Sequence, residues 1–239
     1  VSIPVIAVGR LEVPEIAEHI LEQSQADMIA LGRGLLTDPY WVRKVESGLF
    51  NRIRPCIGCF DGCMGRIYAG RSLSCAVNPS VGRERTYKIE RATEPRNVAI
   101  IGAGVAGLEA ARTAAMRGHK VTLYEKSNVV GGSLVPGSVP SFKKDLESLL
   151  KWYKIELEDT DVDIKMHFNM SSEAVKRLES DIVIIATGAN PVIPSVPGIK
   201  QNYVFTAPEI MCGNVDIGER IAVVGGGVDF PRERYWRLA

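Results

Sequence analysis

The sequence predicts an α/β fold with parallel strands, because two strand-helix-strand segments lie on either side of a cysteine-rich stretch. The first segment runs from Ile3 to Leu31. The second begins at Asn97 with a strand, a glycine turn, a helix and another strand. Strands that alternate with helices pair in parallel and are covered by those helices. Between the two segments, residues 51–95 show little periodicity.

The N-terminal segment has the pattern of two buried strands joined by a helix. Ile3 to Val8 and Asp27 to Leu31 are apolar runs, and each is followed by or ends in a Gly-Arg pair. Such runs are typical of fully buried parallel strands. Val13 to Gln25 carries a helical apolar stripe, and a short helix is expected from Trp41 to Glu46.

The cysteine-rich stretch has the spacing of an iron-sulfur site. Cys56, Cys59, Cys63 and Cys75 stand as C-x2-C-x3-C-x11-C. Three thiolates close together in sequence and a fourth farther on can ligate the irons of a [4Fe-4S] cubane. We expect this cofactor, rather than a hydrophobic core, to order residues 51–95.

Two other roles of these cysteines are less favoured. Structural zinc prefers two separated CxxC pairs, which this spacing is not, although zinc stays an alternative. Disulfides are disfavoured because the cysteines crowd one loop of a chain with no secretion signal. Cys212, the fifth cysteine, is expected to have no role.

The glycine turn after Asn97 predicts a dinucleotide site. Gly102, Gly104 and Gly107 follow a strand and open a small-residue helix, and the next strand, Lys120 to Tyr124, ends at Glu125. This is a Rossmann-like fingerprint, in which the glycines admit the pyrophosphate and the acid accepts from the ribose hydroxyls. Glu125 also disfavours a 2'-phosphate ligand.

Later residues favour FAD at this first site, and a second glycine turn indicates another nucleotide fold. Gly132 and the pair Thr187 and Gly188 resemble the further FAD contacts of two-dinucleotide flavoproteins. IAVVGGG, residues 221–227, looks like the first strand of an NAD(P)H-binding fold, with Gly225 and Gly227 in the first two glycine positions. The fingerprint is incomplete, because Phe230 stands at the third position. We expect the chain to be truncated here.

Composition excludes several classes of protein. The formal net charge is +1 and no basic stripe is present, so no nucleic-acid partner is expected. No run of 18 apolar residues and no secretion signal is found, so we expect no membrane span and a cytoplasmic location. The chain begins at Val1 and not at Met, and we expect the true start to lie upstream.

The order of these motifs, RPCIGCFDGC and then GAGVAG with Glu125, resembles the NADH:flavin oxidoreductase and 2,4-dienoyl-CoA reductase family. These are old-yellow-enzyme-type flavoproteins with an iron-sulfur cluster. The resemblance implies the C-terminal end of a TIM (β/α)8 barrel at residues 1–50, a [4Fe-4S] loop at 51–95, a Rossmann-like FAD domain at 96–195, and the start of an NAD(P)-binding domain at 196–239. Gly9, Arg10, Gly32 and Arg33 would then bind the phosphate of FMN at the ends of two barrel strands.

The resemblance implies an electron relay from NAD(P)H through FAD and the cluster to FMN, which reduces an activated alkene. The expected partner is a small unsaturated carbonyl compound or thioester, and a homo-oligomer is compatible with the sequence. No residue is assigned as catalytic acid or base. The alternatives are an electron-transfer module without a substrate site, an amine dehydrogenase relative, and an inert fragment that folds only around residues 97–190.

Overall fold

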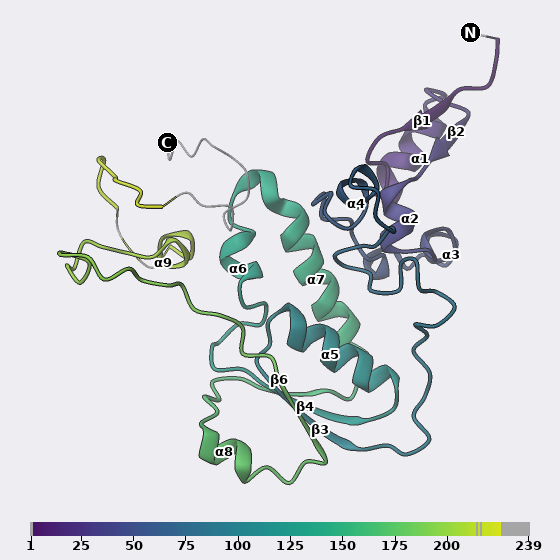
Figure 1. The fold of residues 1–239 in the computed structure, drawn as a ribbon. Coiled ribbons are helices and arrows are strands. Elements are labelled where there is room, and N and C mark those ends of the chain that lie inside the picture. The colour runs from purple at the N-terminus through teal and green to yellow at the C-terminus, as the bar shows by residue number, and fades with distance from the viewer. Residues whose placement is uncertain (1, 214, 216, 226–239) are drawn as a thin grey trace. The chain divides into compact units, whose positions relative to one another are not determined.

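The structure is a computed structural model that describes residues 2–213, 215 and 217–225. The chain divides into two compact units, Val1–Val192 and Ile193–Ala239, and each is described by itself. Every strand pair among the described residues is parallel, which confirms the predicted α/β class. Figure 1 shows the order of the helices and strands.

The first unit begins with a sheet of two strands. β1 (Ile6–Val8) pairs in parallel with β2 (Met28–Ala30), with Val8 opposite Ala30. The strands are joined by α1 (Pro14–Glu22), whose first residue is a proline, where a missing N–H costs nothing. Two further helices follow, α2 (Arg33–Thr37) and α3 (Trp41–Glu46).

These two strands are paired as predicted but are not buried, so that part of the prediction is wrong. Ile6 is 55% exposed, Val8 74% and Met28 47%. A parallel strand is buried only when helices cover both faces and further strands flank both edges. Among the described residues, β1 and β2 pair only with each other.

The cysteine-rich stretch contains two short helices, η1 (Phe50–Arg52) and α4 (Met64–Tyr68). The expectation that no hydrophobic core orders it is wrong in part. Val77 is 6% exposed and belongs to the main core, and Ile57 and Cys75 pack against that core. The loop is therefore held at its base by apolar contacts and not by a cofactor alone.

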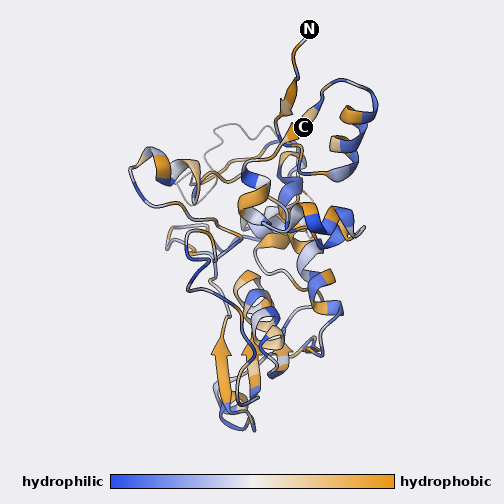
Figure 2. Cartoon of the chain, turned by 90° about the vertical axis from the view of Figure 1, so that its right-hand side faces the viewer, coloured by the Kyte–Doolittle hydropathy of each residue, from blue (hydrophilic) through white to orange (hydrophobic). Residues whose placement is uncertain are grey.

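The larger sheet belongs to the segment that the sequence predicts to bind a dinucleotide. It contains β3 (Asn97–Ile101), β4 (Lys120–Tyr124), β5 (Asp163–Lys165) and β6 (Ile182–Ile185) in the order β5-β4-β3-β6. Figure 2 shows strands with mostly hydrophobic residues in this sheet. The strand order reverses beside β3, and ligands of open parallel sheets bind at the carboxyl ends of the strands next to such a reversal.

Two helices build the core with this sheet. α5 (Val105–Met116) follows the glycine turn, and α7 (Lys144–Glu158) packs against α5. Ile100, Leu108, Leu123 and Leu149 are at most 2% exposed, and each such burial stabilises the fold by about 1.5–3 kcal/mol. Short elements α6 (Leu134–Gly137) and η2 (Ser141–Lys143) lead into α7.

Two short helices complete the described elements. α8 (Ser172–Lys176) is capped by Ser171, whose Oγ accepts from the Ala174 N–H at 3.2 Å. In the second unit, α9 (Ala207–Met211) has a capping box between Thr206 and Glu209. The described residues 217–225 form no helix or strand, so the strand expected within residues 221–227 is not found in the part of it that the structure describes, 221–225. A strand needs a partner to satisfy its backbone, and the described part of this unit contains none.

Among the described residues, none of the helices has both the length and the apolar character needed to cross a bilayer.

Candidate functional site

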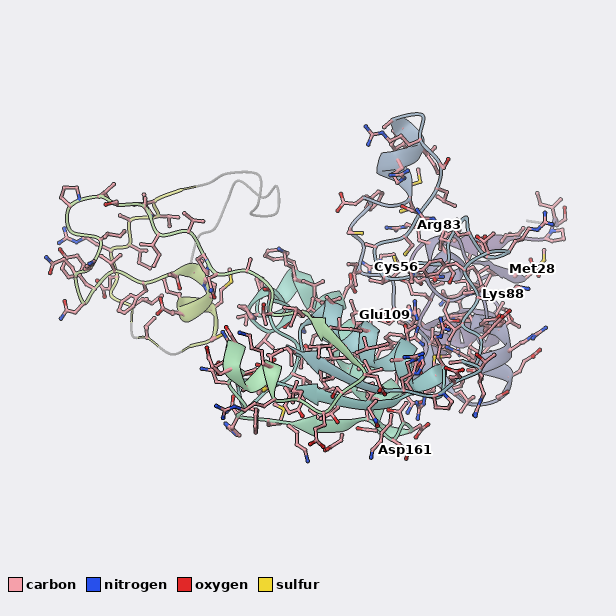
Figure 3. The ribbon with its side chains drawn as sticks, turned by 60° about the horizontal axis from the view of Figure 1, so that its bottom comes forward. Met28, Cys56, Arg83, Lys88, Glu109 and Asp161 are labelled. Carbon is pink, nitrogen blue, oxygen red and sulfur yellow. The ribbon has the colours of Figure 1, made fainter. Side chains whose placement is uncertain are left out.

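The four predicted ligand cysteines line one cavity in the first unit. Cys56, Cys59, Cys63 and Cys75 face it together with Arg33, Phe60 and several apolar residues. Cys63 is buried, Cys59 is exposed, and the other two are half-buried. The stretch that carries Cys56, which is labelled in Figure 3, therefore brings together thiols that are up to 19 positions apart (75 − 56).

Close contact between two arms of the loop places Cys75 beside the other three. The Ser74 N–H donates to the Gly62 carbonyl oxygen at 2.7 Å. A Cβ atom at position 62 would lie 2.8 Å from the Cα of Cys75, so only glycine permits this approach. This backbone contact thus brings Cys75 close to Cys63, although eleven residues separate them in the sequence.

The four cysteines supply the sulfur donors that an iron-sulfur cluster can take. The four cysteines are free thiols. Over the described ranges, no three His, Cys, Asp or Glu side chains converge as a single metal ion would require. The choice between a [4Fe-4S] cubane and zinc therefore stays a prediction from the cysteine spacing.

A cation stands beside the thiols. The Arg33 guanidinium lies 4.5 Å from the centroid of the Phe60 ring, and both side chains line the cysteine cavity. Burial raises the pKa of the Cys56 thiol, while the Gly58 N–H and the charge of Arg33 act in the opposite direction. Arg33, which the sequence assigned to the FMN phosphate, is placed where it also faces the cysteines.

The residues predicted to hold the FMN phosphate follow two paired strands. Gly9 and Arg10 come directly after Val8 of β1, and Gly32 and Arg33 come shortly after Ala30 of β2. Because the strands are parallel, both Gly-Arg pairs lie at the carboxyl ends of the strands, on the same side of the sheet. Arg10 donates two hydrogen bonds of 2.8 Å to the Asp145 carboxylate of α7, and this bonding raises the pKa of Arg10.

The glycine turn brings together the predicted FAD glycines. Gly104 forms a parallel bridge with Gly131, and the Gly131 N–H donates to the Ala103 carbonyl at 2.8 Å. A Cβ at Gly132 would lie 2.9 Å from the Cα of Gly104. A Cβ at Gly107 would lie 1.8 Å from the Gly102 carbonyl oxygen, so the helix can start only with glycine there.

Thr187 and Gly188 lie next to this turn at the end of β6. The Ala186 N–H donates to the Ile101 carbonyl at 2.8 Å, which fixes the end of β6 beside the start of the turn. Thr187 and Gly188 are exposed directly after this point. In the second unit, Gly225 has a φ of +108° and is exposed, and Gly227 lies outside the described residues.

Glu125 is the buried anion of the site. It is 7% exposed, and its Oε2 accepts from the Ala103 N–H of the glycine turn at 2.8 Å. Its Oε1 accepts from the N–H and the hydroxyl of Ser127 at 2.9 and 2.8 Å. Burial acts to raise the pKa of Glu125, but these hydrogen bonds outweigh it and the pKa is lowered. Among the described residues Oε2 accepts from one N–H, which leaves it a lone pair for a further donor.

We predict that Glu125→Gln lowers the stability of the fold near neutral pH by about 1–3 kcal/mol, because an amide nitrogen would face N–H donors. A carboxyl whose pKa is lowered by folding stabilises the protein above its unfolded value of about 4.3, and this contribution disappears as the pH falls through the folded value. The gap in melting temperature between wild type and variant should therefore narrow in acid.

A series of thermal melts between neutral and acid pH checks this prediction. Glu158→Gln is the matched control, because Glu158 is an exposed glutamate at the end of α7. A gap that stays constant across the pH range would show that the ionised Glu125 does not stabilise the turn.

Comparison with known proteins shows the family. Residues 96–228 match the family described as pyridine nucleotide-disulphide oxidoreductase, which is more than half of the chain. The chain belongs to this family. Residues 1–52 match a second description, NADH:flavin oxidoreductase / NADH oxidase family. Together the two matches confirm the resemblance inferred from the sequence, and their descriptions name a pyridine nucleotide and a flavin.

Similar members of the family are known from sequence and structure. The chain is 42% identical over 228 residues to cinnamate reductase of Clostridium sporogenes, covering 95% of the chain and 34% of that protein. It is also 42% identical over 234 residues to NADH oxidase of Thermoanaerobacter brockii, covering 95% of the chain and 36% of that protein. The chain thus spans about a third of the length of these relatives.

A solved structure of 2-naphthoyl-CoA reductase in complex with 2-naphthoyl-CoA has the same fold. The TM-score is 0.87 and the sequence identity is 31%, over 91% of this chain and 33% of the other. The fold of the chain is therefore shared with a protein of known structure.

Three residues that contact a predicted site residue or the flanks of the cysteine loop were not identified from the sequence. They are Asp145 and Trp152 on α7 and Arg54 beside Cys56. The signal for α7 was present, because Leu146, Leu149, Leu150, Tyr153 and Leu157 repeat at helical spacing. Nothing in the local pattern indicates which partners these polar side chains contact.

Proposed function

We propose that this chain is the electron-supply part of a flavin- and iron-sulfur-dependent oxidoreductase that reduces an activated alkene. When bound, FAD would take hydride from NAD(P)H, and a [4Fe-4S] cluster would pass single electrons to FMN at the alkene. The observation that carries the proposal is that four cysteines line one cavity in the same compact unit as the glycine turn and Glu125.

The residues of the chain divide this work among them. The cysteines would hold the cluster, with Gly62 permitting the loop to close. Gly102, Gly104, Gly107, Gly132 and Glu125 would bind the ADP half of FAD, the glycines by exposing backbone and the carboxylate by accepting from ribose. Thr187 and Gly188 would contact FAD at the end of β6. Gly225 and Gly227 would belong to the NAD(P)H site.

The four residues at the ends of β1 and β2 would bind the FMN phosphate. Gly9 and Gly32 offer backbone N–H groups, and Arg10 and Arg33 offer charged forks suited to a phosphate dianion. Arg10 would then share its guanidinium between the phosphate and Asp145.

The names of the relatives support the substrate class. Cinnamate and 2-naphthoyl-CoA each carry an unsaturated system conjugated to a carboxyl group or a thioester, which lowers the barrier to hydride addition. We propose an enone, an enoate or a dienoyl thioester as the substrate class of the whole protein. The cytoplasmic location and a homo-oligomer stay predictions from the sequence.

The test is an anaerobic purification followed by a visible spectrum and by iron and acid-labile sulfide assays. Broad absorption near 400 nm with about four irons and four sulfides per chain, together with flavin bands, is the expected result. A chain that holds zinc, or no metal after reconstitution with iron and sulfide, would contradict the relay and leave only a flavin-binding fold.

A further inference from the structure

Two arginines lie on one buried tryptophan between the cysteine loop and the nucleotide-binding fold. The Arg54 guanidinium is 4.4 Å from the centroid of the Trp152 ring, and that of Arg112 is 5.4 Å from it. Trp152 is 3% exposed and Arg112 is 5% exposed. A cation over an indole is attracted most strongly where water is excluded. We name these three side chains the Arg-Trp-Arg stack.

Arg54 also joins the two ends of the cysteine loop. Its Nη1 donates to the Val77 carbonyl oxygen at 2.7 Å. Arg54 lies two residues before Cys56, and Val77 lies two residues after Cys75. One side chain therefore bridges the outer flanks of the segment that carries all four cysteines.

The nucleotide-binding fold holds the same end of the loop through further hydrogen bonds. The Trp152 Nε1–H donates to the Arg52 carbonyl at 3.0 Å, and Arg52 Nη1 donates to the Ile155 carbonyl at 2.8 Å. On the other side of the loop, the Arg54 N–H donates to the buried Asp38 carboxylate at 2.9 Å. The stack is thus anchored in α7 at one side and in the segment after α2 at the other.

Carboxylates on α5 and α7 compensate the positive charge of the buried Arg112. Arg112 donates to Glu109 at 2.8 and 3.2 Å and lies 3.7 Å from Glu156. Burial acts to lower the pKa of Arg112, and these carboxylates outweigh it and raise the pKa. Arg112 and Trp152 are therefore a fixed platform on which Arg54 rests.

We propose that the Arg-Trp-Arg stack holds the cysteine loop closed before any cluster is bound, so that the nucleotide-binding fold is the scaffold on which the cluster assembles. Arg54 is a positioning residue, since it acts through the loop and not on the cluster. The role of the loop as a cluster site rests on the proposed function. The claim that the stack closes the loop does not rest on it, and it can be measured separately on the iron-free chain.

The test compares Arg54→Lys with wild type in the full chain. Lysine keeps the charge but loses the planar fork that both stacks on an indole and donates to a carbonyl. Arg71→Lys is the matched control, because Arg71 is an exposed arginine of the same loop. Trp152→Phe is a second variant that keeps a ring but removes the hydrogen bond to Arg52. Circular dichroism melts establish that each variant is folded.

The first readout is the rate at which iodoacetamide labels each cysteine of the iron-free chain, resolved by mass spectrometry of peptides. Cys63 is buried, and the exposed Cys59 and Cys212 are internal references. We expect Cys63 to react about tenfold faster in Arg54→Lys than in wild type. A tenfold change corresponds to a decrease of ~1.4 kcal/mol in the free energy of opening the loop. The labelling rate of Cys63 should be unchanged in Arg71→Lys. The second readout is the rate at which a chelator removes iron from the chain reconstituted with ferrous iron and sulfide, which should rise in the same variant.

Each outcome decides the proposal. Labelling and iron release that are the same in Arg54→Lys, Trp152→Phe and wild type would overturn it. If the wild-type chain takes up no iron and sulfide, the proposed function fails. The labelling rates of Cys63 then still decide whether the stack closes the loop.

Discussion

A Gly102→Ala chain is expected to lose the stability of its nucleotide-binding fold. Gly102 has a φ of +104°, and a Cβ there would lie 2.4 Å from the Ala186 carbonyl oxygen at the end of β6. The backbone strain and the contact with a fixed carbonyl add to about 3 kcal/mol or more. Urea unfolding of the full chain measures the loss as a lower midpoint with an unchanged slope.

Alanine substitutions at two other glycines are the controls for the loss of stability in Gly102→Ala. Gly118 also has a positive φ, +86°, but a Cβ there meets nothing within 4 Å, so Gly118→Ala should cost only about 1 kcal/mol. Gly104 has a φ of −75°, and its Cβ would lie 3.9 Å from the Cα of Gly132. Gly104→Ala should therefore fold normally and yet lose FAD, because the methyl group occupies the approach of the pyrophosphate.

Equal unfolding midpoints for wild type and Gly102→Ala would show that the turn is not as close to β6 as the structure has it. FAD affinity is measured by fluorescence titration. An unchanged affinity in Gly104→Ala would show that the pyrophosphate does not bind at this turn.

The second large effect is expected from Cys63→Ser. Cys63 is the buried member of the four cysteines, and a serine hydroxyl does not ionise near neutral pH as a thiol does when it binds iron. The iron content should fall from about four per chain to nearly none, and the contribution of the cluster to absorption near 400 nm should disappear and leave the flavin bands. FAD binding should persist, because the glycine turn does not depend on the cysteines.

Cys212→Ser is the control for this change, since Cys212 is exposed and lies in the second unit. It should keep the full iron and sulfide content. A Cys63→Ser chain that retains its iron would mean that this cysteine is not a ligand, and the C-x2-C-x3-C-x11-C assignment would need another donor.

The sequence alone determined the elements that depend on local chemistry. Lys120–Tyr124 and Trp41–Glu46 have the same bounds in the structure as in the prediction. The glycine turn could be located because only glycine tolerates a positive φ and the close approach of backbone at Gly102. The cysteine spacing likewise identified four side chains that line one cavity. These signals lie within about ten to twenty residues of sequence, where periodicity and spacing are informative.

Only the tertiary structure decided which distant side chains meet. Trp152 donates to the carbonyl of a residue 100 positions away, and Arg10 binds a carboxylate 135 positions away. No local pattern encodes such a partner, because any exposed arginine has the same sequence signature as one that stacks on a buried ring. The exposure of β1 and β2 was also decided at this level, because the burial of an apolar strand depends on which elements cover it and not on its own residues.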